Sequence, residues 1–192
     1  MGYTHNFEQN QAPSADEWKA FKGKLMQAFE LFLTGEDTKG IVICDGSGKR
    51  PLESSKNLFS YAPEKENVPA LDDFTGAAKV QAFDKAISAL THEERKEYVC
   101  FNGDGRNDQD LGHETFYLPS AEYPEYNFCK TARKPYDLLV MIALVLAHIY
   151  MPGCYDLGTD GDNEEWQAAF DWLNKYMSDD ANPRQLAQLN PS

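Results

Sequence analysis

The sequence is short of positive charge. Its 192 residues include 18 lysines and arginines against 31 aspartates and glutamates, a formal net charge of −13 at pH 7. A negative field of this size repels nucleic acid and anionic membrane surfaces, so we expect neither as a partner. A small anionic ligand held by a local group of cations remains compatible with the charge.

Signals of secretion, membrane insertion and metal binding are also missing. No basic-then-apolar leader opens the chain, and the apolar run 138–150 is too short to span a bilayer. The four cysteines form no Cys-x-x-Cys pair, and the four histidines show no spacing typical of zinc. We therefore expect a cytoplasmic protein with free thiols, no metal and no cofactor.

The hydrophobic pattern predicts one α+β domain over residues 1–178, with a mixed sheet of about five strands around a buried helix at 138–150. Two or three outer helices should cover it. The first begins at a capping box of Ser14 and Glu17 and ends at Gly35, and the last covers 166–177. Expected strands are 1–7 (an edge strand), 41–44, 58–61, 97–101, 113–118, 123–129 and 154–158. Residues 62–96 are interpreted as an insertion with a helix at 77–90, and 179–192 as a flexible polar tail.

The stretch 127–150 organises the rest of the chain. Its second half is apolar on every face, which is typical of a helix buried in a core. Pro135 suits the first helical position, and just before it stand Lys130, Thr131, Arg133 and Lys134. Cations at a helix start oppose the helix dipole, so three of them there predict a site for an anion, above all phosphate. A merely solvated basic surface is the alternative.

Residues from two strand ends are expected to join this helix start in one cleft. Cations clamp phosphates, aromatic rings stack on a base, and amides, hydroxyls or carboxylates read ribose or base edges. The predicted ligand-binding residues are Asn102, His113, Thr115, Lys130, Thr131, Arg133, Lys134 and Tyr136. If the protein is an enzyme, its catalytic groups would be His113, Glu114 and Asp104, although solvated loop charge also explains these acids.

Two further stretches carry weaker signals for reactive or phosphate-binding groups. Cys129 stands next to Lys130, whose charge would lower the pKa of the thiol and make it a nucleophile, but an ordinary buried thiol is the favoured interpretation. Asp45-Gly-Ser-Gly-Lys49 lacks the spacing and the final Ser or Thr of a phosphate-binding P-loop, so a turn at a strand exit is expected there.

Three blocks of the sequence resemble a family of small phage and prophage proteins. They are Met1-Gly-Tyr-Thr-His5, Phe101-Asn-Gly-Asp-Gly105 with His113-Glu-Thr-Phe116, and Phe128-Cys-Lys-Thr-Ala-Arg-Lys-Pro-Tyr-Asp137. The ending Asp160-Gly-Asp162 with Trp166 also fits. Asn6-Phe7 departs from the family's Tyr-Trp pair, and the acidic segment 64–95 is longer. The resemblance implies an origin in the cytoplasm of an infected bacterium more than an activity.

Together these features predict a phage anti-defence protein that binds and sequesters a nucleotide-derived immune signal, either of the cyclic ADP-ribose type or a cyclic dinucleotide. Two alternatives remain open: a nucleotide phosphodiesterase or hydrolase that degrades such a signal, and an acidic inhibitor that binds a host defence protein. A homodimer through the apolar helix and a monomer with that helix in its core explain the sequence equally well.

Overall fold

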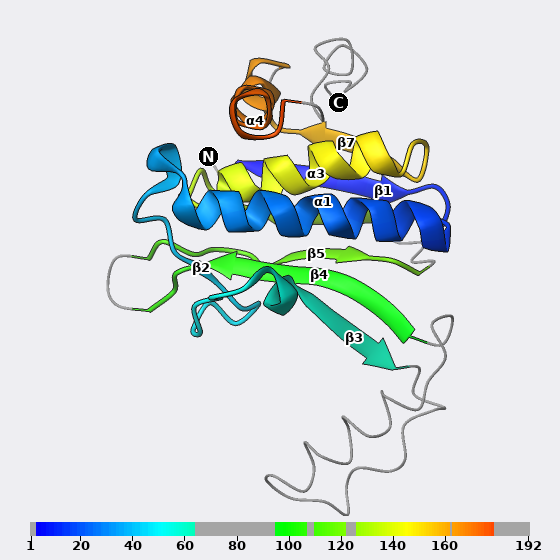
Figure 1. Ribbon diagram of the computed structural model, residues 1–192, viewed down its shortest axis with the longest axis horizontal. Helices are drawn as coiled ribbons and strands as arrows, with labels where there is room; N and C mark the ends of the chain where they lie inside the picture. The colour runs from blue at the N-terminus through cyan, green and yellow to red at the C-terminus, as the bar shows by residue number, and fades with distance from the viewer. Residues whose placement is uncertain (1–2, 64–94, 107–109, 122–125, 162, 179–192) are drawn as a thin grey trace, which may run out of the picture.

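A computed structural model of the chain describes residues 3–63, 95–106, 110–121, 126–161 and 163–178 (Figure 1). Its helices are α1 (Ala15–Thr34), α3 (Asp137–Tyr150) and α4 (Asn163–Tyr176), with short 3-10 turns η1 (Glu36–Thr38) and η2 (Ser55–Leu58). Its strands are β1 (Thr4–Gln9), β2 (Ile43–Cys44), β3 (Phe59–Pro63), β4 (Arg95–Gly103), β5 (Phe116–Pro119), β6 (Tyr126–Lys130) and β7 (Tyr155–Thr159). The expected helix 77–90 and tail 179–192 lie outside the described residues, as does nearly all of the expected insertion 62–96.

The α+β class expected from the sequence is confirmed, but the strands are divided differently. Instead of one mixed sheet, the described strands form two antiparallel sheets. One has the order β6-β1-β7, and the other is built on β4, which pairs with β2, β3 and β5. Figure 1 shows α1 and α3 side by side, with the β4 sheet below them and α4 on the opposite side.

Helix α1 follows from local sequence signals. The Ser14 hydroxyl accepts from the Glu17 N–H at 3.3 Å, while a Glu17 carboxylate oxygen accepts from the Ser14 N–H at 2.8 Å, which confirms the capping box. The helix ends before Gly35, as expected. Its buried residues recur at helical spacing and form the face against the core: Trp18, Phe21, Leu25, Ala28, Phe29 and Phe32.

Helix α3 is the centre of the core, as its apolar sequence predicted. Every residue from 139 to 147 is buried. The expected range 138–150 is correct within one residue, but Pro135 is not the first helical residue, because the helix begins at Asp137. Ala132 and Arg133 adopt positive φ angles of 52° and 57°, so the chain makes a turn here before it enters the helix. The acid in the first turn suits the helix dipole, and the cations stand farther from the helix end than the sequence suggested.

Strand β1 lies in the middle of its sheet, which corrects the expected edge position. Its residue His5 lies opposite Cys129 of β6 and Thr159 of β7. Both partner strands are more than a hundred residues away along the chain, so no local signal reveals the pairing. No helix in the described ranges is long and apolar enough to cross a membrane.

Candidate functional site

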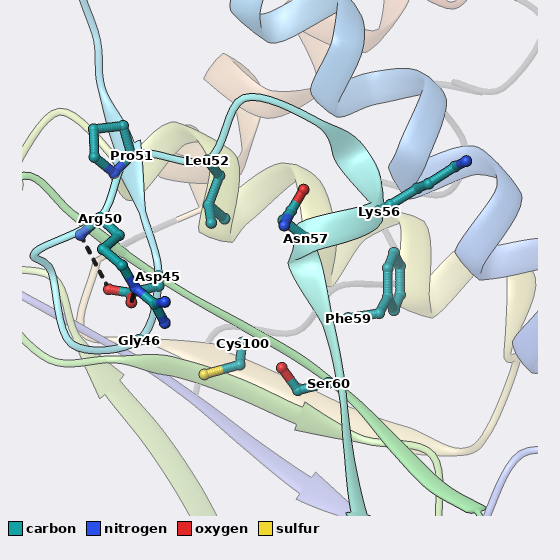
Figure 2. A pocket seen from close by; sticks show the side chains of 10 residues that line it. All are labelled: Asp45, Gly46, Arg50, Pro51, Leu52, Lys56, Asn57, Phe59, Ser60 and Cys100. Atoms are coloured by element: carbon teal, nitrogen blue, oxygen red, sulfur yellow. Dashed lines mark hydrogen bonds and ion pairs between the residues drawn. The ribbon is translucent and has the colours of Figure 1, made fainter. Parts of the chain in front are cut away.

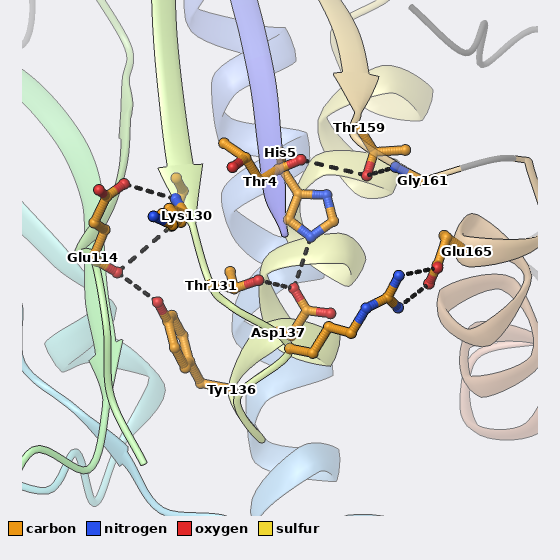
Figure 3. A network of polar contacts seen from close by, with 12 residues as sticks. Thr4, His5, Glu114, Lys130, Thr131, Tyr136, Asp137, Thr159, Gly161 and Glu165 are labelled. Carbon is orange, nitrogen blue, oxygen red and sulfur yellow. Dashed lines mark hydrogen bonds and ion pairs between the residues drawn. The ribbon is translucent and has the colours of Figure 1, made fainter. Parts of the chain in front are cut away.

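The three sequence blocks that carry the phage resemblance meet in one polar network (Figure 3). Nε2 of His5 lies 2.7 Å from Oδ1 of Asp137, and the Thr131 hydroxyl donates to the same oxygen at 2.5 Å. His5 and Thr131 are fully buried. The network therefore ties β1 to the start of α3, with the Asp137 carboxylate as the shared acceptor.

A second part of the network joins β6 to the segment before β5. One Glu114 carboxylate oxygen accepts from the Lys130 N–H at 2.7 Å, and the buried Tyr136 hydroxyl donates to the Glu114 carbonyl at 2.7 Å. Burial raises the pKa of Tyr136, so its phenol stays protonated. Through these bonds Glu114, which lies just before β5, connects the β4 sheet to β6 of the other sheet.

In the basic cluster, by which we mean Lys130, Arg133 and Lys134, the side chains of Arg133 and Lys134 are engaged with acids of the protein itself. Arg133 makes two bonds to the carboxylate of Glu165, at 2.8 and 2.5 Å, and its guanidinium lies 4.1 Å from the ring centroid of Tyr3. The ammonium of Lys134 contacts the carbonyl and carboxylate of Asp110 at 2.6 and 3.1 Å. An anion bound by Arg133 or Lys134 would have to displace a carboxylate already in place.

The predicted ligand residues from the other strand ends stabilise loops. The Asn102 side chain donates to the His113 carbonyl at 3.0 Å and accepts from the His113 and Gly103 N–H groups at 3.2 and 2.8 Å. These bonds replace the strand that was expected to begin at His113. The Thr115 hydroxyl donates to the Gly46 carbonyl at 2.6 Å, whereas the His113 side chain is exposed.

Asp104, one of the predicted catalytic residues, is paired with a neighbouring cation. Asp104 makes bonds of 2.8 and 2.9 Å to the Arg106 guanidinium, which hold the pKa of its carboxyl at about 2. No group of three or more His, Cys, Asp or Glu side chains in the described ranges is placed to hold a metal. Whether His113, Glu114 and Asp104 act in catalysis stays a prediction.

The interpretation of Cys129 as a buried thiol is confirmed, and the nucleophile alternative is wrong. The thiol is fully buried, and burial raises its pKa to about 12 instead of lowering it. Lys130 follows it on the strand, so the two side chains point to opposite faces of the sheet. The neighbouring charge therefore cannot activate this cysteine.

Of the eight predicted ligand residues, Asn102, Thr131 and Tyr136 are buried and bonded within the protein. The structure brings Lys130, Thr131 and Tyr136 to one network, while Arg133 and Lys134 turn toward separate acids. Their role in binding a ligand remains a prediction. A second candidate site for a ligand lies elsewhere in the fold.

A pocket of about 370 Å³ opens on the other sheet, where β2 and β3 pair with separate stretches of β4 (Figure 2). Cys100 lies between those stretches. We call this the loop pocket, because the loop after β2 forms one wall and η2 with β3 the other. Its lining residues are Asp45, Gly46, Arg50, Pro51, Leu52, Lys56, Asn57, Phe59, Ser60 and Cys100.

Asp45 orders the loop wall of the pocket. Its carboxylate accepts from the Ser47 hydroxyl at 2.6 Å and from Arg50 Nε at 2.8 Å, and these bonds hold its pKa well below the usual range. The carbonyl of Gly48, which has a φ of 71°, accepts from the Gly105 N–H at 2.9 Å and fastens the loop to the end of β4.

The loop pocket combines cations, neutral polar groups and apolar walls. Arg50 uses Nε for Asp45, so its two terminal nitrogens can donate to a ligand, and its side chain is 85% exposed. Figure 2 shows Lys56 on the opposite side, directed away from Arg50, with Asn57 and Ser60 between them. Half of its ten lining residues are polar or charged and half are apolar or glycine, and its volume lies in the range of small-ligand sites.

Sequence reasoning missed the pocket wall formed by Lys56, Asn57 and Ser60. The loop 45–51 is rich in glycines and cations, but its sequence predicts a plain turn. Only the run of polar residues 53–57 before a strand hinted at the second wall, and nothing local places it against Cys100.

Comparisons of the chain with protein-family models, with curated proteins and with solved structures gave no match. The resemblance to phage proteins thus stays a prediction that rests on the three sequence blocks.

Proposed function

We propose that this protein binds a small nucleotide-type anion in the loop pocket and holds it without converting it. In the phage setting that the sequence blocks suggest, the ligand would be an immune signal such as a cyclic ADP-ribose isomer or a cyclic dinucleotide. The observation that carries the proposal is the pocket itself, with Arg50 donors on one wall and apolar side chains beside them.

Charge supports an anion at this place. In a chain with a net charge of −13, the stretch 49–56 has three exposed cations, Lys49, Arg50 and Lys56, against one acid, and Arg50 and Lys56 line the pocket. Planar guanidinium donors suit phosphate oxygens because two parallel bonds can form at once. Asn57 and Ser60 can bond to hydroxyl groups of the same ligand.

The basic cluster is the alternative site for the anion, because the sequence predicts anion binding there. There Arg133 must leave Glu165, and Lys134 must leave Asp110, before either can hold a phosphate. Arg50 needs no such exchange, since its bond to Asp45 uses a single nitrogen. The two locations can be separated by matched arginine variants.

The test incubates purified protein with a panel of cyclic ADP-ribose isomers and cyclic dinucleotides. The mixture is filtered, the retained protein is heat-denatured, and both fractions are analysed by mass spectrometry. We expect one ligand to be depleted from the filtrate and recovered intact after heating. Arg50→Ala should abolish this retention, whereas Arg133→Ala and Lys19→Ala, an exposed cation on α1, should leave it unchanged.

Other outcomes give different conclusions. Loss of retention in Arg133→Ala alone would move the site to the basic cluster. A ligand recovered with a new mass would make the protein a hydrolase and direct attention to His113, Glu114 and Asp104. If every ligand stays in the filtrate, the nucleotide-binding proposal is overturned.

A further inference from the structure

Two tyrosines in contact lie beside the loop pocket on the same sheet. The ring centroids of Tyr98 on β4 and Tyr117 on β5 are 4.7 Å apart, with an interplanar angle of 41°. Both side chains are partly exposed, whereas their strand neighbours Val99 and Phe116 are buried in the core. The pair therefore belongs to the sheet face turned away from the helices, where its rings can meet a ligand.

The strand register connects this pair to the pocket. Tyr98 lies opposite Ser60, and Tyr117 lies opposite Cys100. Ser60 and Cys100 both line the loop pocket. Side chains directly opposite in an antiparallel pair point to the same face, with Cβ atoms about 4.5–5.5 Å apart. Each tyrosine is thus one strand spacing from a pocket-lining residue.

We infer that the Tyr98–Tyr117 pair is a stacking platform for a planar ring whose attached anionic group occupies the loop pocket. The ligand class is then a nucleotide, in which ribose separates a heteroaromatic base from phosphate, and not free phosphate or a sugar phosphate. The inference rests on the proposed function, because it takes the loop pocket as the site of the anion.

The size of the expected effect comes from base stacking. Stacking of one base on an aromatic side chain changes affinity by about 5- to 150-fold, and it tolerates any base because every base has a π-face. A ribose phosphate bound in the pocket should therefore gain at least about fivefold in affinity when a base is added.

The experiment measures binding of adenosine 5′-monophosphate, ribose 5-phosphate and inorganic phosphate to the full chain by titration calorimetry. We expect the nucleotide to bind at least about fivefold tighter than ribose 5-phosphate. In a Tyr98→Leu, Tyr117→Leu double variant the two affinities should become equal, with that for ribose 5-phosphate unchanged. Tyr98→Phe, Tyr117→Phe should keep the preference, because a phenyl ring also stacks.

Tyr61→Leu is the matched control. Tyr61 lies opposite Glu97, which is buried beneath α1, so it belongs to the other face of the sheet and should not affect the preference. Equal wild-type affinities for nucleotide and ribose 5-phosphate would overturn the platform while leaving anion binding in place. If the leucine double variant lost affinity for the nucleotide and for ribose 5-phosphate equally, the two tyrosines would have only a structural role, and the platform would be overturned. No binding of any of the three compounds would overturn the platform and count against the proposed function as well.

Discussion

The imidazole of His5 and the carboxylate of Asp137 are 132 residues apart in the chain, yet their Nε2 and Oδ1 atoms lie 2.7 Å from each other. His5 is fully buried, and the Asp137 side chain is 13% exposed. Because Thr131 donates to the same oxygen, one carboxylate satisfies two buried donors from different elements. This contact fixes the N-terminal strand to the core helix.

Removing that carboxylate should destabilise the fold. Asp137→Ala leaves His5 and Thr131 without their acceptor, so we expect a loss of about 2–4 kcal/mol in the free energy of unfolding. Urea denaturation measures it. Asp171→Ala is the control, because Asp171 is an exposed acceptor for Gln167 on α4, and its loss should change stability by at most about 0.5 kcal/mol. Similar small losses in both variants would contradict a stabilising role for the His5–Asp137 contact.

Two leucines on α1 test the assignment of its buried face. Leu25 is fully buried, whereas Leu33, two turns farther along, is 37% exposed. Leu25→Ala should cost about 2–5 kcal/mol through lost burial and a cavity, and Leu33→Ala about 0.5 kcal/mol or less. Thermal and urea unfolding of the two variants provide the measurement. Equal costs would contradict the assignment of Leu25 to the buried face of α1 and of Leu33 to its exposed side.

Acid should weaken the fold partly through Asp104. Its bonds to Arg106 lower the pKa in the folded state to about 2 from the ordinary 3.8. The ionised Asp104 carboxylate contributes its full stabilisation above pH 3.8. This contribution is lost as the pH falls through about 2. We expect Asp104→Asn to cost about 1 kcal/mol at pH 7, a value reduced because Arg106 is partly exposed, and to cost almost nothing at pH 2. A constant cost at both pH values would show that the ionised form is unimportant.

The cysteines should differ in their rates of alkylation. Cys44, Cys129 and Cys154 are fully buried, while Cys100 is partly exposed at the loop pocket. Burial raises the pKa of all four thiols, so reaction with iodoacetamide at pH 8 should be slow and should begin at Cys100. Peptide mass spectrometry over time identifies the order. Early labelling of Cys129 would contradict its burial.

Features set by neighbouring residues could be predicted from the sequence. The capping box at Ser14 depends on a side chain three residues away, and the burial of α3 follows from an apolar run with no polar face. The capping signal and the pattern of the last helix therefore agree with the structure within a few residues. The start of α3 was misplaced because the positive φ angles of Ala132 and Arg133 delay the helix, and neither residue type signals that conformation.

The site was harder to predict, because it depends on contacts between distant segments. The basic residues near Arg133 are real neighbours, but their acidic partners Asp110 and Glu165 come from other parts of the chain. The loop pocket needs the loop after β2, η2 and Cys100 of β4 together. Sequence patterns identify groups of residues with suitable chemistry, and tertiary pairing determines which of them stay available to a ligand.

The central position of β1 has a consequence for protein synthesis. Gln9 is made 146 residues before Tyr155, its partner on β7. At ribosomal rates of about 5–20 residues per second, this strand waits roughly 7–30 s for that neighbour. During translation its apolar side chains, such as Phe7, have no sheet to join, so the nascent chain exposes them until nearly the whole domain has left the ribosome.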